Sequence, residues 1–329
     1  MVAQAVIKEI ALPFHAVLSS DGFSYAIPAA FLKRLRMLKP RLVVSYIGGD
    51  ILDCPEAEVG RRRTPMVNWL IRQSVTGPEA LRPVSPMLEA ILLAEGAPPE
   101  RITVCPSHLV KSDREISPIL GSRERVAREV RARHAIPPMA PLAITLGGNH
   151  KGKGLHLLAR AWPAVVRNCP EARWVLGGPA HPWLDEAVWP ELRRADVAHT
   201  VTACGPLEGL DVFRHLASAD LHVNPSLCES LNMVTVEAAA VGTPTITSDG
   251  AGVAHWVRRF DAGQVVPRSQ VGALADAIIS AFRNKEQLRR WSLAGRAMSS
   301  EFSLDRVATA LLALMAGDST AAQQGDRNA

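Results

Sequence analysis

The chain has 329 residues, of which 47% are hydrophobic and 21% are charged, and its net charge is +5. This length suits two ordinary domains, and the absence of any apolar run of about 18 residues argues against a membrane-spanning helix. The five cysteines are widely spaced and form no C-x-x-C pair, which disfavours a disulfide framework and a metal site.

The first part of the chain shows irregular α/β patterning. A helix is predicted over residues 29–38 and a strand over 41–47, closed by Gly48-Gly49-Asp50. Two short strands are predicted at 84–85 and 102–104, separated by a helix over 86–95. Residues 106–140 carry several prolines and charges and are predicted to link two halves of the protein.

From residue 141 onward, short apolar runs alternate with amphipathic stretches. Strands are predicted at 142–146, 173–176, 199–204, 221–223, 245–247 and 264–266. Helices are predicted at 154–168, 207–218, 271–282, 286–298 and 304–315. Because the strands are apolar throughout and alternate with helices, the pattern predicts a parallel sheet covered on both faces. In such a doubly wound domain, ligands bind at the carboxyl ends of the strands.

The positive charge is unevenly distributed along the chain. Residues 1–140 hold 19 Lys/Arg against 14 Asp/Glu, whereas the remaining residues hold 18 of each. Two basic clusters stand out: Lys33, Arg34, Arg36, Lys39 and Arg41, and Arg61, Arg62 and Arg63. They suit either peripheral contact with an anionic membrane or an ordinary solvated surface. Few aromatic residues accompany them, which argues against nucleic-acid binding. Charge comes too early in residues 1–9 for a signal peptide, so a cytoplasmic protein is expected.

A glycine-rich loop over residues 147–154 follows the first strand of the second part and precedes a helix. Its glycines let backbone amides approach an anion, the helix amino terminus adds a partial positive charge, and Lys153 adds a full one. The loop therefore suits a diphosphate. Its spacing resembles a P-loop, but Gly154 replaces the hydroxyl residue that would hold magnesium, which disfavours an NTPase. A flexible turn with a surface lysine remains the alternative.

A second constellation covers residues 224–244. A strand is predicted to end near residue 225, a loop to carry Glu229, and a helix to begin near Thr235 with Glu237 in its opening turn. This arrangement brings both carboxylates to the same edge of the sheet, where they can accept hydrogen bonds from vicinal hydroxyls of a sugar or ribose. Alternatively, Glu229 is a solvated loop carboxylate and Glu237 complements the helix dipole.

Taken together, these motifs resemble a known family. Residues 141–315 resemble the carboxyl-terminal domain of the retaining glycosyltransferases of family four, which have the GT-B architecture. The match includes Pro225-Ser226, the spacing from Glu229 to Glu237, Gly242-Thr243-Pro244, Ser248-Asp249-Gly250-Ala251-Gly252 and Glu301-Phe302-Ser303. Residues 28–115 resemble the later part of the family's amino-terminal domain more loosely.

The resemblance implies an α/β, GT-B-like fold with two Rossmann-like domains facing a cleft. The implied domains are a partial acceptor-side domain over 1–115, a linker over 116–140, a sugar-nucleotide domain over 141–315 and a disordered tail over 316–329. The chain starts after the family's opening strand and Gly-rich loop, so the amino-terminal domain is expected to be truncated.

The resemblance also implies roles for individual residues. Lys153 is expected to contact the donor diphosphate and Glu229 to hold hydroxyls of the transferred sugar, and both are expected to be catalytic. Glu237 is expected to hold the nucleotide ribose. The expected donor-binding residues are Gly148, Asn149, Lys153, Glu229, Ser230, Leu231, Asn232, Met233 and Glu237. The family usually has an arginine where this chain has Gly148, and His150 or Lys151 is a candidate substitute.

The implied activity is the retaining transfer of a sugar from a nucleoside-diphosphate sugar to an acceptor hydroxyl in glycan or polysaccharide biosynthesis. The acceptor is expected to be a glycan, a lipid or a small molecule. Neither a cofactor nor a metal ion is expected, and the chain has no D-x-D pair that would chelate one. Gly148 and the missing opening strand leave an alternative, a catalytically degenerate GT-B protein that binds a sugar nucleotide or a protein partner.

Overall fold

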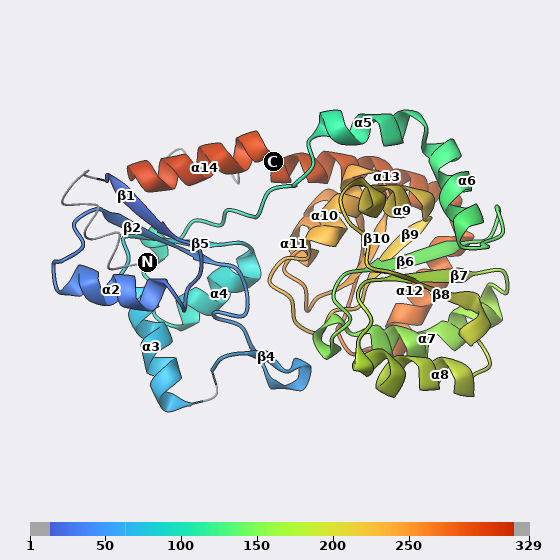
Figure 1. The fold of residues 1–329 in the computed structure, drawn as a ribbon, viewed down its shortest axis with the longest axis horizontal. Helices are drawn as coiled ribbons and strands as arrows, with labels where there is room; N and C mark the ends of the chain where they lie inside the picture. Colours follow the sequence, from blue (N-terminus) through green and yellow to red (C-terminus); the bar gives the residue numbers. More distant parts are fainter. Residues whose placement is uncertain (1–13, 63, 319–329) are drawn as a thin grey trace. The chain divides into compact units, whose positions relative to one another are not determined.

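The computed structural model describes residues 14–62 and 64–318, and it divides into two compact α/β units (Figure 1). Unit 1 comprises the described residues up to His108 and those from Leu304 onward, whereas unit 2 comprises Leu109–Ser303. Relative to the domains expected from the sequence, the segment 116–140 joins unit 2 and the last helix joins unit 1. Most of the expected disordered tail, residues 319–329, lies outside the described residues.

Unit 1 is built on a three-stranded parallel sheet in the order β1-β2-β5. Its strands are β1 (Ala16–Ser19), β2 (Arg41–Tyr46) and β5 (Ala80–Pro83), and a separate antiparallel pair is formed by β3 (Asp53–Cys54) and β4 (Val59–Gly60). Its helices are α2 (Ala26–Arg34), α3 (Pro65–Thr76), α4 (Pro86–Ala94) and α14 (Leu304–Ala316).

Two of the three strands predicted for this unit were wrong. The strand expected at 84–85 lies at Ala80–Pro83, and Ser85 instead caps α4 by accepting a hydrogen bond from the Leu88 N–H. Ile102 forms an isolated bridge with Leu81 rather than a strand. The third strand is β1, which the sequence pattern did not reveal because its apolar run is very short.

The last helix completes the core of unit 1. Val307 and Leu314 on α14 are buried together with Val43 and Ala80 of the sheet. Arg41 Nε donates a hydrogen bond to the Leu314 carbonyl at 3.0 Å, and α14 lies along β1 and β2 (Figure 1). Local periodicity predicted this helix, but its partner sheet depends on contacts with residues more than 200 positions away.

Unit 2 is built on a six-stranded parallel sheet in the order β11-β10-β9-β6-β7-β8, which confirms the predicted doubly wound sheet. Its strands are β6 (Leu142–Leu146), β7 (Arg173–Gly177), β8 (Val201–Gly205), β9 (Leu221–Asn224), β10 (Thr245–Ser248) and β11 (Gly263–Val266). Its α-helices are α5 (Asp113–Gly121), α6 (Arg123–Arg133), α7 (Leu155–Asn168), α8 (Trp189–Arg194), α9 (Leu210–Ser218), α10 (Met233–Ala240), α11 (Ala254–Phe260), α12 (Val271–Arg283) and α13 (Lys285–Ser299).

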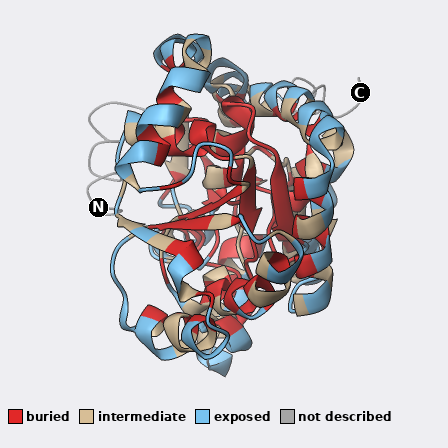
Figure 2. Cartoon of the chain, turned by 90° about the vertical axis from the view of Figure 1, so that its right-hand side faces the viewer, coloured by how far each residue is buried: buried red, intermediate tan, exposed pale blue. Residues whose placement is uncertain are grey.

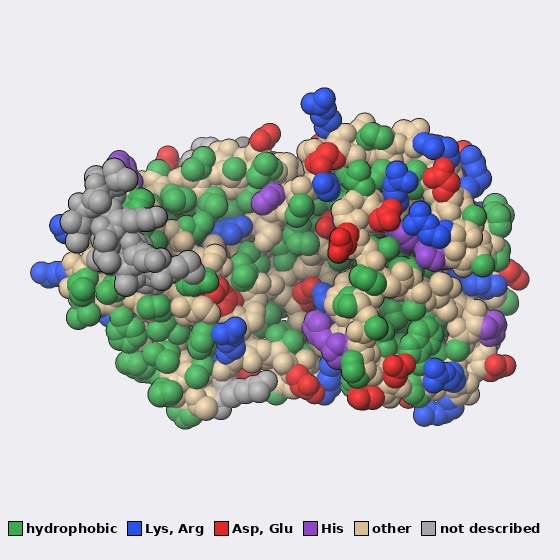
Figure 3. Space-filling view, viewed as in Figure 1, with side chains coloured by type: hydrophobic (Ala, Val, Ile, Leu, Met, Phe, Trp, Pro, Cys, Tyr) green, Lys and Arg blue, Asp and Glu red, His purple; other side chains and the backbone are tan. Residues whose placement is uncertain are grey.

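The sheet of unit 2 is covered on both faces. Every residue of β6, β9 and β10 is buried, while the edge strands β8 and β11 are partly exposed. Figure 2 shows the buried strands enclosed by helices with exposed outer faces. This burial explains why the strands read as continuous apolar runs in the sequence. Basic and acidic side chains are intermixed over this unit on the face seen in Figure 3.

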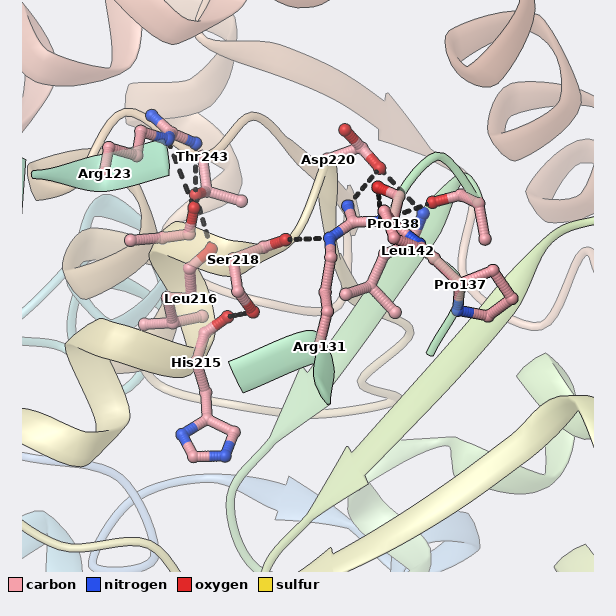
Figure 4. A network of polar contacts seen from close by, with 12 residues as sticks. Arg123, Arg131, Pro137, Pro138, Leu142, His215, Leu216, Ser218, Asp220 and Thr243 are labelled. Carbon is pink, nitrogen blue, oxygen red and sulfur yellow. Dashed lines mark hydrogen bonds and ion pairs between the residues drawn. The ribbon is translucent and has the colours of Figure 1, made fainter. Parts of the chain in front are cut away.

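The residues expected to form a linker fold onto unit 2 as α5 and α6. Two arginines of α6 attach it: Arg123 donates to three backbone carbonyls and to the Thr243 hydroxyl at 2.8 to 3.2 Å. Arg131 pairs with Asp220 at 3.0 Å and donates to the Ala140 carbonyl at 2.7 Å (Figure 4). These guanidinium groups satisfy carbonyls that would otherwise be buried without partners, so the charges of this segment serve packing.

The basic clusters of unit 1 are partly used inside the unit. Lys33 pairs with Glu79 at 2.8 Å, and Arg62 pairs with Glu95 at 2.5 Å. Arg63 lies outside the described residues. These contacts favour the structural interpretation of the clusters over a free basic surface. Across the described part of the chain, none of the helices has the length and apolarity that a membrane crossing requires.

Candidate functional site

The loops after β6 and β9 meet because these strands are neighbours in the sheet of unit 2. The chain runs from β6 outward to β7 and β8, then returns to place β9 on the other side of β6, so the direction of winding switches between β6 and β9. The Leu227 N–H donates to the Gly152 carbonyl at 2.9 Å and ties the two loops together. In open α/β sheets, this switch point is where ligands bind.

Glycine allows the loop after β6 to approach its neighbour. Gly154 has a φ of +67°, and a Cβ there would overlap the carbonyl oxygen of Pro225. The chain then enters α7 at Leu155, after a short 3₁₀ turn over Lys151–Lys153. A bulkier residue at position 154 would therefore separate the two loops and displace the neighbouring Lys153.

Lys153 and Glu229 form an ion pair across the two loops. The Glu229 carboxylate also accepts hydrogen bonds from Asn232 Nδ2 at 2.7 Å and from the Ser226 hydroxyl at 2.8 Å. Burial acts to raise the pKa of Glu229, but the positive charge of Lys153 and these donors outweigh it, and the net pKa is lowered. Glu229 is therefore held as a carboxylate next to a cation.

Backbone hydrogen bonds fix the loop that carries Glu229. Its N–H donates to the Gly250 carbonyl and its carbonyl accepts from the Gly252 N–H, both at 2.9 Å. A third bond of 2.9 Å runs from the Val253 N–H to the Leu231 carbonyl. A Cβ on Gly250 would overlap the backbone of residues 226–227. The glycines of the Ser248–Gly252 motif therefore build the wall that supports Glu229.

Asn232 caps the amino terminus of the helix that follows. Its side-chain oxygen accepts the Thr235 N–H at 2.8 Å, so α10 starts at Met233, two residues earlier than predicted. The backbone N–H groups of Leu231, Asn232 and Met233 have no intramolecular acceptor within the described residues. The first N–H groups of a helix lack partners in the preceding turn, so these three can bind an oxygen ligand. Ser230 lies in the same loop.

Glu237 occupies the second turn of α10, which corrects the opening turn predicted for it. It is partly buried, and within the described residues its carboxylate accepts no hydrogen bond and makes no ion pair with Lys153. Burial raises its pKa to about 7. A buried acid without a donor is costly, and a ligand with hydroxyl groups would satisfy it.

The remaining predicted residues after β6 behave differently. Gly148 has no side chain to replace the family's arginine. Asn149 is buried, and its Nδ2 donates to the Pro179 carbonyl at 2.6 Å, so its side chain joins two loops instead of facing a ligand. Burial and the charge of Lys153 lower the pKa of His150, which makes it a poor substitute for a permanent cation.

Ser226 belongs to the site but was not among the predicted residues. It is buried, and its hydroxyl lies between Glu229 and Asn224, whose side-chain oxygen is 2.6 Å away. Ser226 and Asn232 each stand three positions from Glu229 in the sequence. That symmetric polar spacing was a usable signal for the groups that orient this carboxylate.

Comparison with known proteins agrees with this description. Residues 140–284 match the family described as "Glycosyl transferases group 1". The D-inositol 3-phosphate glycosyltransferase of Nocardia farcinica is 28% identical over 187 residues, covering 55% of this chain but 42% of that protein. The GDP-mannose-dependent alpha-(1-6)-phosphatidylinositol monomannoside mannosyltransferase of Mycobacterium tuberculosis is 25% identical over 295 residues, covering 87% of this chain and 74% of that protein.

Solved structures extend the similarity of fold to nearly the whole chain. Anabaena Alr3699/HepE in complex with UDP has a TM-score of 0.79 at 15% identity, covering 96% of this chain and 82% of that chain. WaaG, a glycosyltransferase involved in lipopolysaccharide biosynthesis, has a TM-score of 0.66 at 18% identity, covering 92% of this chain and 82% of that chain. Residues 140–284 therefore match the group 1 glycosyltransferases, and the two parallel α/β sheets of this chain give it the fold of these solved GT-B glycosyltransferase structures.

Proposed function

We propose that this chain transfers a sugar from a nucleoside-diphosphate sugar to an acceptor hydroxyl, with retention at the anomeric carbon and without a metal ion. The observation that carries the proposal is the Lys153–Glu229 ion pair at the switch point of the unit 2 sheet. A cation, a fixed carboxylate and unused backbone N–H groups belong to two loops that are hydrogen-bonded to each other.

Each of these groups has a distinct task in the proposed reaction. When the bond between the anomeric carbon and the diphosphate breaks, negative charge grows on the departing phosphate. Lys153 and the N–H groups of Leu231, Asn232 and Met233 would stabilise that charge, which is the electrostatic component of catalysis. Glu229, already held as a carboxylate, would accept hydrogen bonds from hydroxyls of the transferred sugar.

Glu237 would bind the nucleotide through its ribose. Two vicinal hydroxyls donating to this carboxylate stabilise its charged form and so lower its pKa from about 7. Binding of the nucleotide would then release a proton near neutral pH. The same unsatisfied carboxylate that destabilises the free protein would become a hydrogen-bonded one in the complex.

A second candidate is a degenerate protein that binds a sugar nucleotide without turnover. Gly148 favours it, because a missing guanidinium typically costs a few kcal/mol of charge stabilisation. The lowered pKa of His150 favours it further, because a neutral imidazole cannot replace that charge. Lys153 is retained in either case, so nucleotide binding is expected from both candidates and only turnover separates them.

We assign the acceptor, a glycan, lipid or small molecule, to unit 1, and any peripheral membrane contact to the same unit. A cytoplasmic location follows from the use of nucleotide sugars. The relatives suggest which donors to test first, since one is described as GDP-mannose-dependent and HepE was solved with UDP.

A donor screen tests the proposal. The full chain is incubated with UDP-glucose, GDP-mannose and ADP-glucose, with and without a mixture of sugar and lipid acceptors, and the released nucleoside diphosphate is measured. Release from at least one donor is expected, with loss in Lys153→Ala and retention in Lys285→Ala, an exposed lysine on α13. Binding without release would establish the degenerate alternative, and neither binding nor release would refute both.

A further inference from the structure

Three potential metal ligands meet in unit 2, away from the loops described above. His134 follows the last residue of α6, Cys204 lies in the edge strand β8, and His215 lies in α9. The Nε2 atoms of the two histidines are 2.9 Å apart, and one ring nitrogen of each histidine and the Cys204 sulfur all lie within 4.8 Å of one another. The three residues are separated in sequence, so no local motif predicts that they meet.

The imidazole of His215 is already oriented as a metal ligand. Its Nδ1 lies 2.7 Å from the backbone carbonyl of Asp211, which can only accept, so Nδ1 carries the proton. The Nε2 lone pair then accepts a hydrogen bond from His134 Nε2, and a metal ion would replace this bond. A ligating histidine usually donates its second ring N–H to a carbonyl or carboxylate in this way. Figure 4 shows this ring pointing away from the network of Arg131 and Ser218.

An ion pair and a thiol lie beside the two rings. Arg133, next to His134 in the chain, pairs with the Asp211 carboxylate at 3.7 Å, so the arginine's charge is partly offset. The Cys204 thiol has one weak acceptor, the neighbouring Gly205 carbonyl at 3.8 Å. Its sulfur is therefore not committed to a strong interaction.

We propose that His134, Cys204 and His215 form a zinc site that links the end of α6 to α9 and to the edge strand β8. Tetrahedral zinc with Zn–N of about 2.05 Å and Zn–S of about 2.3 Å requires N–N separations near 3.4 Å and N–S separations near 3.6 Å. The two imidazoles need to separate by about 0.5 Å, a change within the reach of side-chain rotation. His134 and Cys204 are partly exposed, which lets a water complete the fourth position.

Binding changes the protonation of one group. The Cys204 thiol loses its proton to solvent as the zinc–sulfur bond forms. The ring proton of His134 moves from Nε2 to Nδ1 so that Nε2 can bind, which releases no further proton. One proton is therefore released per zinc bound. Since α9 leads directly into β9, whose end carries the loop of Ser226 and Glu229, the site would stabilise a segment that supports the nucleotide loops. This inference does not depend on the proposed transferase activity.

Cobalt substitution tests the site in the full chain. The protein is freed of metal with a chelator, dialysed and titrated with CoCl₂ and then with ZnCl₂. One equivalent of Co²⁺ is expected to give tetrahedral bands in the visible range and a thiolate-to-cobalt band in the near ultraviolet, and Zn²⁺ is expected to bleach both. One equivalent of Zn²⁺ is also expected to raise the Tm by several degrees.

Matched variants locate the binding. Cys204→Ser is expected to lose the thiolate band, and His134→Gln to weaken Co²⁺ binding about 100-fold or more. Cys169→Ser and the exposed-histidine variant His199→Gln are expected to keep both properties. Circular dichroism without metal checks folding, and His134→Gln, at a partly exposed helix end, carries the test if Cys204→Ser misfolds. Absence of saturable one-to-one binding, or a thiolate band that persists in Cys204→Ser, would overturn the proposal.

Discussion

Carboxylates near the strand ends have opposite hydrogen-bonding environments in the two units. In unit 1, Asp50 follows β2 and accepts the backbone N–H groups of Gly22, Ile47 and Gly48 at 2.7 to 3.3 Å. In unit 2, the Glu237 carboxylate in the helix after β9 accepts no hydrogen bond within the described residues. A buried acid with every oxygen satisfied stabilises the fold, whereas one without donors costs stability until a ligand arrives.

Glu229 lies between these extremes. Its carboxylate contacts the side chains of Lys153, Ser226 and Asn232, and the charge of Lys153 contributes most to lowering its pKa. A ligand that takes Lys153 for its phosphates can leave Glu229 free to bind hydroxyl groups. Unit 1 thus holds a structural acid, Asp50, whereas unit 2 holds two acids, Glu229 and Glu237, that are available to a ligand.

The largest effect is expected from Glu229→Gln. This change keeps the shape of the side chain but removes its charge, and it is expected to reduce donor turnover about 100- to 1000-fold, as for other preorganised electrostatic groups. Asp50→Asn is the matched control, with turnover per folded molecule unchanged. Steady-state release of nucleoside diphosphate measures both, and equal losses in the two variants would remove the distinction between the units.

Gly154→Ala tests whether the two loops of unit 2 need their close approach. The positive φ and the overlap with Pro225 are expected to destabilise the protein by about 3 kcal/mol. Gly49 in unit 1 has no atom within 4 Å of an added Cβ, so Gly49→Ala is expected to change stability by less than about 1 kcal/mol. Urea unfolding compares them, and a neutral Gly154→Ala would show that the loops tolerate separation.

Glu237→Gln is expected to stabilise the free protein. The pKa of Glu237 is raised from its ordinary value of 4.5 to about 7, so the folded state holds its proton more tightly and stability falls as pH rises across that interval. Relative to wild type, the free energy of unfolding of the variant should be higher by about 2 kcal/mol at pH 8 and unchanged below pH 4.5.

Asp50→Asn should move stability the other way. The asparagine amide replaces one acceptor oxygen with a donor facing backbone N–H groups, which is expected to cost about 2 kcal/mol. Thermal and urea unfolding at several pH values measure the change in the free energy of unfolding for both variants. A loss of stability in Glu237→Gln at pH 8 would mean that its carboxylate has a partner in the free protein.

The smallest effect is expected from Gly148→Arg, which restores the family's guanidinium. An added Cβ at Gly148 meets only the His150 ring at 3.3 Å, and this side chain can move. Binding of a nucleoside diphosphate is expected to tighten about tenfold through charge-assisted hydrogen bonds. Gly148→Ala should change the affinity less than about twofold, and titration calorimetry that finds the same affinity in both variants would count against a diphosphate at this loop.

Much of unit 2 was predictable because its strands are continuous apolar runs that end at glycine, proline or polar residues. The rule that parallel strands place their carboxyl ends at one edge brought Lys153 and Glu229 into the same region, and the structure shows them as an ion pair. The start of α10 was missed because the capping role of Asn232 was not read from its sequence position.

Long-range choices were not predictable. The amphipathic pattern of α14 is the same whichever sheet it covers, and its assignment to unit 1 depends on the fit of Val307 and Leu314. The arginines of α6 looked like linker charges, because their carbonyl acceptors exist only once the sheet has formed. Asn149 was predicted to face the donor, but burial commits its side chain to Pro179.

Equilibrium binding of UDP, GDP and ADP to the full chain, measured by titration calorimetry at pH 6 and pH 8, tests the central claim most directly. We predict that at least one nucleotide binds saturably, more tightly at pH 8, and that Glu237→Gln binds it more weakly and loses the part of this pH dependence that Glu237 contributes. No binding by any of the three, or identical affinities and pH profiles in wild type and variant, would contradict a nucleotide site at this edge of unit 2.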